Sequence, residues 1–289
     1  MDYLGFCRNF AHTNGPRCPT KQKKKMMNEW KELTLATCQV ARQAGHYLRD
    51  ERRRFRPERI EEKHAHDFVS YVDREAERYV VEGLRRLRPD AGFLTEEGTA
   101  AYDGQAACWI IDPLDGTTNF IHDLPPFAVS IAFAVDGAVK MGVVYEACRD
   151  ECFYAWRDGG AWLDGQPIHV DNASPLGRTL VGVELPYEAT AYAPTGHRII
   201  DRFYGLAAGL RMNGSAATSL AYVAAGRFGA WAERFIKPWD FAAGWLLVEE
   251  AGGVASGFDG TPVRLDGDGI AAAATPTLHG ALLEALIQH

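Results

Sequence analysis

The sequence predicts a mixed fold, α+β in its first part and α/β in its second. Two helix-like patterns open the chain, and four strand-like runs follow between residues 108 and 158. After residue 179, strands and helices alternate, which is typical of an α/β domain. A chain of 289 residues with 47% hydrophobic residues can build a large core, so neither disulfides nor a structural metal is needed for stability.

The helices of the first part are read from apolar residues at helical spacing. Such stripes run through residues 28–55 and 73–88, and Pro89 ends the second helix. The basic run RDERRRFRPER (49–59) is expected to form a solvated helix end and loop, with a basic patch near a phosphate site as the alternative.

The strands of the first part are short apolar runs punctuated by turn signals. Four of them are CWIID (108–112), FAVSIAFAV (127–135), AVKMGVVYE (138–146) and ECFYAWRD (151–158). Asp-Gly pairs favour two-residue hairpins, so Asp136-Gly137 is expected to join the second and third runs. A further hairpin is expected in AWLDGQPI, around Asp164-Gly165. This part therefore reads as helices packed on a largely antiparallel sheet.

The second part alternates strands with helices. The expected strands are 179–184, 228–233 and 269–274, and the expected helices are 196–209, 215–225, 239–251 and 277–288. Gly252-Gly253 closes the third helix. We place a domain boundary near residue 185, around Pro186, which divides the chain into 28–185 and 186–289.

Residues 1–27 are expected to be a disordered N-terminal extension, because they lack periodicity and contain the basic run KQKKK. The extension is read as dispensable, with Met26 or Met27 as an alternative start and a targeting arm as the other interpretation. No run of about 18 apolar residues is present, so no transmembrane helix is expected. The six cysteines form no C-x-x-C pair and read as reduced thiols of a cytoplasmic protein. The net charge of −7 argues against nucleic-acid binding through bulk positive charge.

The segment WIIDPLDGTTN (109–119) places two carboxylates at the end of an apparently buried strand. Asp112 could cap a following helix with Pro113 at its first position, but this does not explain Asp115. Gly116-Thr117-Thr118 resembles an anion-binding turn of backbone N–H groups. Two acids beside such a turn repel an anion unless cations lie between them. The segment therefore indicates a metal-bridged phosphate site.

Hard cations such as Mg²⁺ prefer oxygen ligands, so more acids are needed. Glu96-Glu97 in LTEEGT and Asp240 in KPWDFAAG are candidates. Taken singly, a double Glu before Gly is more often a solvated turn, and an Asp at a helix start is more often a cap. Trp239 beside Asp240 is read as core packing rather than a stacking platform.

Together these segments carry a specific resemblance. DPLDGTTNF (112–120), LTEEG (94–98) and KPWDFAAG (237–244) resemble three signature blocks of the inositol monophosphatase family. The spacing Lys63, Asp67, Val69-Ser70, Asp73 is similar to a fourth block, and RMNGSAATSLAYVAAGRFGAWAE (211–233) is similar to the family's substrate segment. The blocks occur in family order from about residue 28 to the C-terminus.

The resemblance implies a five-layered α-β-α-β-α sandwich, usually a homodimer, and a Mg²⁺-dependent, lithium-sensitive phosphate monoester hydrolase. It makes 28–185 the metal and phosphate domain and 186–289 the substrate-side domain. It implies two or three Mg²⁺ ions. The first would be held by Glu96, Asp112 and the Leu114 carbonyl, and the second by Asp112, Asp115 and Asp240. A third ion would lie near Glu96.

The catalytic residues that the resemblance implies are Glu96, Thr117 and Asp73, which would orient and deprotonate an attacking water. The implied substrate-binding residues are Glu96, Leu114, Asp115, Gly116, Thr117, Gly214, Ser215, Ala216, Glu233 and Asp240. Among them, the Gly116 and Thr117 N–H groups would bind phosphate, and Glu233 would accept bonds from vicinal hydroxyls of a polyol. Asn213 and Ser70 depart from the commoner family residues without touching a metal carboxylate.

The expected reaction is hydrolysis of myo-inositol 1-phosphate, and nucleic acid is an unlikely partner. One alternative is a sister phosphatase for fructose 1,6-bisphosphate, NADP(H), histidinol phosphate or a 3′-phosphoadenosine nucleotide. Another is a partner of the transcription machinery or RNA, since some bacterial relatives moonlight in this way. The histidines near the blocks, His64, His66 and His122, are read as solvated or packed rather than as ligands, because an all-oxygen site fits Mg²⁺ better than Zn²⁺.

Overall fold

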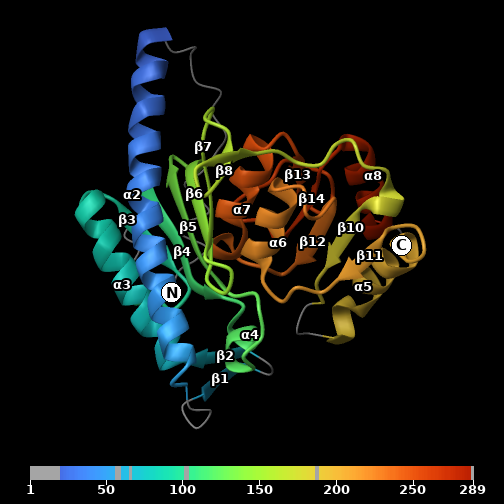
Figure 1. Cartoon of the computed structure of the whole chain (residues 1–289), viewed down its shortest axis with the longest axis horizontal. Helices are drawn as coiled ribbons and strands as arrows, with labels where there is room; N and C mark the ends of the chain where they lie inside the picture. Colours follow the sequence, from blue (N-terminus) through green and yellow to red (C-terminus); the bar gives the residue numbers. More distant parts are fainter. Residues whose placement is uncertain (1–19, 56–59, 65–66, 101–103, 186–188, 288–289) are drawn as a thin grey trace.

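The computed structural model describes residues 20–55, 60–64, 67–100, 104–185 and 189–287. Its first layer consists of two long helices, α2 (Thr20–Arg52) and α3 (Tyr71–Leu87), which pack against each other and against the first sheet (Figure 1). A short antiparallel hairpin, β1 (Ile60–His64) with β2 (Asp67–Ser70), lies between them in the chain. Both helices follow the predicted apolar stripes, and Leu48 and Leu84 are fully buried beneath them.

Helix α2 begins earlier than predicted. The expected start at residue 28 is wrong, because the helix already includes residues 20–27 of the presumed extension. This stretch lacks an apolar stripe, but it consists mainly of Lys, Gln and Met, which favour helix, and contains neither Gly nor Pro. Residues 1–19 lie outside the described residues.

The first sheet has seven strands in the order β3-β4-β5-β6-β7-β8-β9. All neighbours are antiparallel except β3 and β4, which are parallel. The strands are β3 (Gly92–Thr95), β4 (Ala107–Asp115), β5 (Ala128–Val135), β6 (Ala138–Glu146), β7 (Glu151–Trp156), β8 (Ala161–Leu163) and β9 (Gln166–Ile168). The four predicted strands are confirmed, and β3 was not foreseen as a strand.

Both predicted Asp-Gly hairpins are confirmed. Asp136 and Gly137 have φ of 50° and 73°, and Asp164 and Gly165 have φ of 48° and 83°. Positive φ at both central residues is the property of the type I′ turn, whose twist matches that of the flanking strands. Asp, which tolerates this region, followed by Gly is therefore the local cause of the register in β5–β6 and β8–β9.

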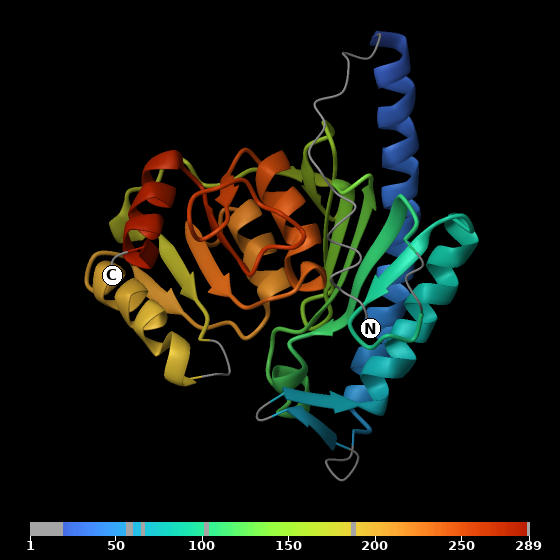
Figure 2. The same ribbon diagram turned by 180° about the vertical axis from the view of Figure 1, so that it is seen from behind.

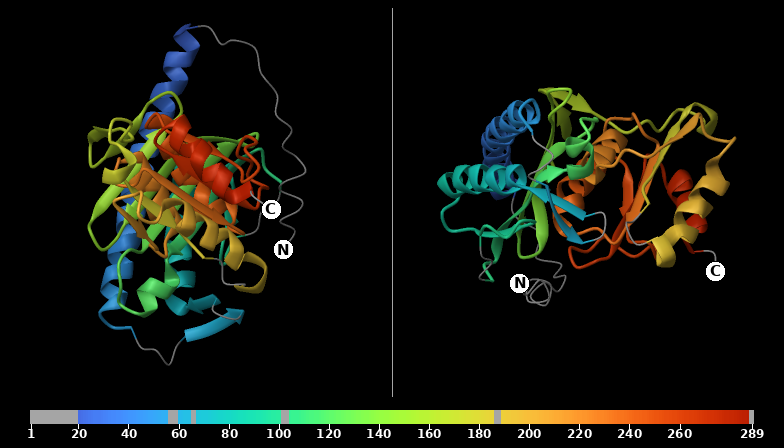
Figure 3. Two further views of the ribbon diagram at one scale, coloured as in Figure 1. Left: turned by 90° about the vertical axis from the view of Figure 1, so that its right-hand side faces the viewer. Right: turned by 90° about the horizontal axis from the view of Figure 1, so that it is seen from below.

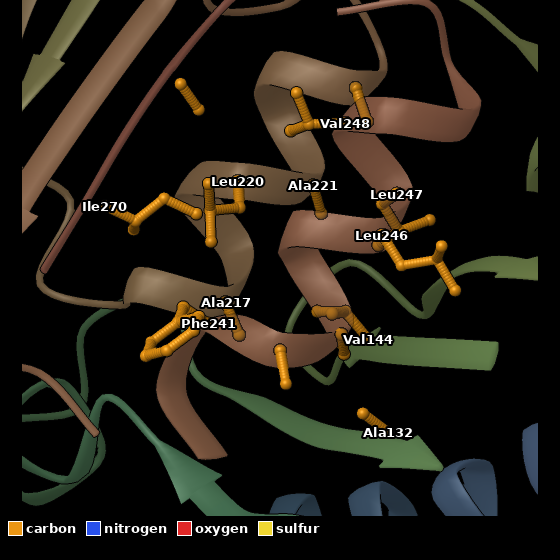
Figure 4. Packing of buried hydrophobic residues seen from close by; sticks show 14 of the residues in the cluster. Ala132, Val144, Ala217, Leu220, Ala221, Phe241, Leu246, Leu247, Val248 and Ile270 are labelled. Carbon is orange, nitrogen blue, oxygen red and sulfur yellow. The ribbon is translucent and has the colours of Figure 1, made fainter. Parts of the chain in front are cut away.

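The central layer consists of α6 (Ala216–Ala224) and α7 (Pro238–Glu250), which lie side by side between the two sheets (Figures 1 and 4). Figure 4 shows Ala221 between the two helices, and Leu220 of α6 beside Ile270 of the second sheet. The first sheet turns small side chains toward this layer. At Gly142 of β6, an added Cβ would lie 2.8 Å from the Cα of Ala243, so α7 is seated directly on the backbone of the sheet.

The second sheet has five strands in the order β11-β10-β12-β14-β13 and mixes parallel with antiparallel pairs. Its strands are β10 (Leu180–Val183), β11 (Gly209–Arg211), β12 (Ala230–Arg234), β13 (Val254–Ser256) and β14 (Gly269–Ala273). Helices α5 (Ala189–Phe203) and α8 (Pro276–Ile287) cover its outer face (Figure 2). Viewed from below, the helices and sheets alternate as α-β-α-β-α (Figure 3), which confirms the predicted fold class.

Helix α5 differs from the helix predicted over 196–209. It ends at Phe203 because Gly205 takes φ of 79°, and the Leu206 and Ala207 N–H groups close the last turn on the Phe203 carbonyl. The chain then enters β11, which was not predicted. The predicted boundary at residue 185 falls after β10, the first strand of the second sheet, so along the chain the strands of the two sheets divide earlier, between Ile168 and Leu180. Pro186 lies outside the described residues. Because α6 and α7 share one hydrophobic cluster with the first sheet, the division into two domains stays a prediction.

Within the described ranges, no helix combines the length and the apolar character that crossing a bilayer requires.

Candidate active site

The first two carboxylates of the site come from the end of β4. The strand continues through Pro113 to Asp115, and its register with β5 shifts between Asp112 and Asp115. Such a bulge tolerates proline, which has no N–H to give to a ladder. Asp112 caps no helix, contrary to the simpler expectation. Its Oδ1 accepts a bond from the Leu114 N–H at 2.9 Å instead.

A short helix, α4 (Thr117–Ile121), follows directly. Gly116 precedes it with φ of 90° and ψ of 38°, and no side chain caps this end of the helix. Gly116 is also crowded, since an added Cβ would lie 2.9 Å from the Pro126 carbonyl oxygen and 3.1 Å from that of Gly214. Only glycine satisfies both conditions. The predicted turn therefore exists, and it lies against the segment that precedes α6.

Asp112, which is 2% exposed, lies near the carboxylates of Glu96, Asp115 and Asp240. Burial, and then the charges of Glu96, Asp115 and Asp240, hold the pKa of Asp112 well above its usual range. Glu96 follows β3, and its N–H binds the carbonyl of Ile111 at 3.2 Å, so β3 and β4 deliver the two acids together. The fold thus assembles acids that lie far apart in the sequence.

Asp115 joins β4 to the start of α6. It accepts bonds from the N–H groups of Ala216 at 3.2 Å and Ala217 at 3.0 Å and from the Ser215 hydroxyl. Burial raises the pKa of Asp115 to about 6, although these hydrogen bonds act in the opposite direction. The predicted residues Ser215 and Ala216 therefore contact the carboxylate cluster directly.

Asp240 occupies the first turn of α7, where it also serves as a cap. Its Oδ2 accepts the Lys237 N–H at 2.6 Å, and Pro238 occupies the first position of the helix. Trp239 packs against the central hydrophobic cluster, as predicted. Asp240 therefore has a structural function as well as its place beside Asp112.

Two of the three predicted water-orienting residues, Thr117 and Asp73, are in direct contact. The Thr117 hydroxyl lies 3.1 Å from Oδ1 of Asp73 and 3.0 Å from the Leu114 carbonyl oxygen. Asp73 is 1% exposed and lies in the first turn of α3. Helix α3 therefore places a carboxylate beside the residues that follow the end of β4.

The segment that precedes α6 is held by two residues that sequence reasoning missed. Glu184, just after β10, accepts the N–H groups of Asn213 at 2.7 Å and Gly214 at 3.0 Å. Asn119 of α4 donates to the carbonyls of Pro126 at 2.8 Å and Asn213 at 2.9 Å. Asn119 lies inside the DPLDGTTNF block, so a signal was present. Glu184 was read only as the end of a strand.

Glu184 is also an electrostatic part of the site. Burial raises its pKa to about 7, and the charge of Asp115 acts in the same direction. Burial, followed by the charges of Glu184, Asp240 and Asp115, holds the pKa of Glu233 well above its usual range. Glu233, near the end of β12, is therefore close enough to these acids for their charges to act on it.

The sequence pattern of the inositol monophosphatase family matches residues 29–289, almost the whole chain. The chain belongs to the inositol monophosphatase family.

Known members of this family cover most of the chain. A Salmonella typhimurium protein named Nus factor SuhB is 43% identical over 231 residues, 79% of this chain and 85% of that protein. An inositol-1-monophosphatase of Mesorhizobium japonicum is 40% identical over 223 residues, 76% of this chain and 83% of that protein. The crystal structure of extragenic suppressor protein suhB from Bartonella henselae has a TM-score of 0.80 and 35% identity, and the match covers 88% of this chain and 97% of that one. The predicted family is confirmed, and with it membership of a group of phosphatases.

Membership of the inositol monophosphatase family raises the question of a metal. Among the described residues, no three His, Cys, Asp or Glu side chains are already arranged to coordinate an ion. The donor set nevertheless fits a hard cation, because it consists of carboxylate oxygens and the Leu114 carbonyl. Burial, and then the charges of Glu96, Asp115 and Asp240, raise the pKa of Asp112, and a bound cation would favour its ionised form.

The other residues that the sequence analysis discussed lie away from the carboxylate cluster or have side chains that the structure does not describe. The side chains of Lys63, Asp67 and Ser70 lie beyond the described residues, as do those of His64 and His66. His122 is exposed. The assignment of individual roles to the site residues stays a prediction.

Proposed function

We propose that this chain is a Mg²⁺-dependent phosphate monoester hydrolase whose substrate is myo-inositol 1-phosphate. The observation that carries the proposal is the convergence of Glu96, Asp112, Asp115 and Asp240 beside the Thr117–Asp73 pair. A buried group of like charges has little value for folding alone, because each acid raises the cost of ionising the others. A requirement for cations explains why the acids lie together.

The metal ligands in this proposal are Glu96, Asp112, Leu114, Asp115 and Asp240. When bound, two or three Mg²⁺ ions would neutralise phosphate charge and lower the pKa of water. The protein's own groups supply positioning. Because Asp115 is bonded to the start of α6, the same residue that holds a cation also fixes the substrate segment.

Water attack is assigned to Glu96 and Thr117, helped by Asp73. The Asp73 carboxylate lies 3.1 Å from the Thr117 hydroxyl, so it can hold that hydroxyl as an acceptor toward water. Glu96 is the proton acceptor, and the backbone N–H groups of Gly116 and Thr117 bind the phosphate oxygens. The chemistry is then mainly positioning and charge stabilisation.

The alcohol part of the substrate is assigned to the second half of the site. Gly214, Ser215 and Ala216 lie against the phosphate-binding turn, and Glu233 can accept bonds from vicinal hydroxyls. This favours a substrate whose alcohol part carries vicinal hydroxyls, as inositol does. Fructose 1,6-bisphosphate, NADP(H), histidinol phosphate and 3′-phosphoadenosine nucleotides are the sister substrates from which the assay must separate it.

The test is phosphate release with and without Mg²⁺ from myo-inositol 1-phosphate and the four sister substrates. We expect the highest kcat/KM for inositol phosphate and complete loss of activity with EDTA. A clear lead for another ester would keep the site but change the substrate. No release from any of them would overturn the proposal.

A second candidate is a partner role in transcription or RNA binding, which is favoured by the relatives named Nus factor SuhB. With such relatives, the expectation that nucleic acid is an unlikely partner is no longer supported. An RNA pull-down at graded salt concentration tests it. RNA retention that persists in Asp112→Asn would separate this role from catalysis.

The cytoplasmic location expected from the cysteines, and the lithium sensitivity and homodimer implied by the family resemblance, complete the proposal. Three exposed apolar side chains in the second half support a dimer, namely those of Tyr204, Leu206 and Met212. Light scattering on the purified protein measures its mass in solution, and a monomer would contradict this part of the proposal.

A further inference from the structure

Helix α3 carries two buried carboxylates, and they contact different parts of the site. Asp73 is bonded to Thr117, while Glu77 is fully buried four residues further along. Residues four apart lie on the same face of a helix. One face of α3 therefore presents two acids to the segments that follow β3 and β4.

The two oxygens of Glu77 bind the turn that follows β3. Oε2 accepts the Glu97 N–H at 2.7 Å, and Oε1 accepts the Thr99 N–H at 2.6 Å. Gly98 lies between these residues with φ of 67°, a conformation that favours glycine. Hydrogen bonds to a carboxylate are stronger than those to a neutral acceptor. Glu77 thus fixes the backbone immediately after Glu96.

We propose that Glu77 is the positioning residue for Glu96, an inference that rests on the proposed phosphatase function. Glu96 lies where an edge strand ends and the chain becomes partly exposed. On the strand side it is fixed by its own N–H bond to Ile111. On the other side the turn is fixed by Glu77, so Glu96 is held between two anchored segments. Such support matters because small displacements of catalytic groups cost large factors in rate.

A conservative substitution at Glu77 can separate its two hydrogen bonds from its shape. A carboxylate accepts at both oxygens, whereas the amide of Gln has one oxygen and one NH₂ group. In Glu77→Gln the NH₂ group faces one of the two backbone N–H groups, donor against donor. At most one of the two bonds then remains. The matched control is Glu82→Gln, which removes the same charge from an exposed position of the same helix.

The first test uses the wild-type protein and hydrogen exchange. The Thr99 residue is exposed, and an amide in an exposed turn ordinarily exchanges fast. We expect the amides of Glu97 and Thr99 to be protected in the wild type and in Glu82→Gln and to lose protection in Glu77→Gln. Unprotected amides in the wild type would overturn the inference without any variant.

The second test measures function and metal binding. For Glu77→Gln we expect kcat to fall about 10- to 100-fold, with little change in KM for the ester. Mn²⁺ affinity, measured by electron paramagnetic resonance, should fall by a similar factor. Glu82→Gln should match the wild type in all three quantities. Wild-type kcat and Mn²⁺ affinity in Glu77→Gln would overturn the inference.

The outcomes separate this inference from the function on which it rests. If the wild type neither releases phosphate nor binds Mn²⁺, the proposed function is wrong and the inference falls with it. If the wild type does both and Glu77→Gln does so equally well, only the inference is wrong. A loss of thermal stability with unchanged kcat would assign Glu77 to folding alone and would likewise overturn it.

Discussion

At the scale of single residues, Asp112 is under a strong electrostatic constraint. It is almost wholly buried, and the charges of Glu96, Asp115 and Asp240 add to the effect of burial on its pKa. Without a cation, an acid whose folded pKa is raised loses its contribution to stability as the pH rises through that value. Ionisation of Asp112 should therefore lower the free energy of unfolding of the metal-free protein at neutral pH.

Asp112→Asn is expected to lose activity and gain stability together. The amide keeps the shape but removes the charge that binds cations and repels its neighbours. Hydrolysis with Mg²⁺ should fall about 100-fold or more, while the Tm of the metal-free protein rises. Asp201→Asn, the same change at an exposed position, should alter neither. Wild-type turnover by Asp112→Asn would show that the metal assignment is wrong.

His279 is expected to make stability fall in acid. Its Nε2 lies 3.0 Å from the Ser256 hydroxyl, and burial lowers its pKa below the usual 6.5. Its contribution is complete above pH 6.5 and is lost as the pH falls through the folded pKa, because the unfolded chain takes up the proton first. Urea unfolding in EDTA between pH 8 and pH 5 measures this effect.

The informative quantity is the difference in unfolding free energy between wild type and His279→Gln. The wild type should lose stability relative to this variant on acidification, whereas exposed His122→Gln should follow the wild type. A constant difference between wild type and His279→Gln across the pH range would contradict the prediction.

Sequence reasoning found the acids that stand in distinctive local patterns and missed those that do not. Asp112 and Asp115 lie three residues apart around a proline, which asks for an explanation. Glu77 and Glu184 are single acids in an ordinary helix and at a strand end. Their partners lie 20 to 30 residues away along the chain. Nothing local distinguishes such residues before the topology is known.

At the scale of elements, the site depends on the contact between α4 and the start of α6. Asn119 spans this contact by binding the carbonyls of Pro126 and Asn213. Glu184 binds the same segment from the second sheet. The substrate segment is therefore held from both halves of the chain.

Asn119→Ala should loosen this segment. The carbonyls left without a donor cost about 1–3 kcal/mol, and we expect KM for the ester to rise more than kcat falls. Steady-state kinetics on purified protein measures both. The control is Asn172→Ala, at an exposed position. An unchanged KM in Asn119→Ala would show that the segment is positioned without it.

Elements with a strong local code were predictable, and elements made by pairing were not. The Asp-Gly turns carry their conformation in their own residues, so the hairpins were correct. Strands β11 and β13 have three residues each and exist because β10 and β14 lie beside them. A pattern read along the chain does not contain that partner.

At the scale of the whole molecule, the proposed site joins the two sheets. The proposed cation ligands Glu96 and Asp112 come from the first sheet and Asp240 from the central helices, while Glu233, on the substrate side, comes from the second sheet. The periodicity of the sequence predicted the two kinds of architecture, while the five-layer order came from the family resemblance. The parallel placement of β3 beside β4 follows from neither pattern.

Mg²⁺ should therefore stabilise the fold as a whole. A ligand that binds only the native state raises the free energy of unfolding as its concentration increases. We expect the Tm to rise with Mg²⁺, to return on addition of EDTA, and to stay constant with NaCl at equal ionic strength. A Tm that is indifferent to Mg²⁺ would contradict the proposed site.

The close contact between α7 and Gly142 also affects the position of a residue in the proposed site. Asp240 stands three residues before Ala243, the residue whose Cα an added Cβ at Gly142 would approach to 2.8 Å. One methyl group at Gly142 would push the helix outward and carry Asp240 away from Asp112. The distance between the first sheet and α7 thus helps to set the geometry of the proposed active site. Among mutations that inactivate the protein we accordingly expect substitutions at buried positions such as Gly142, which do not contact the substrate.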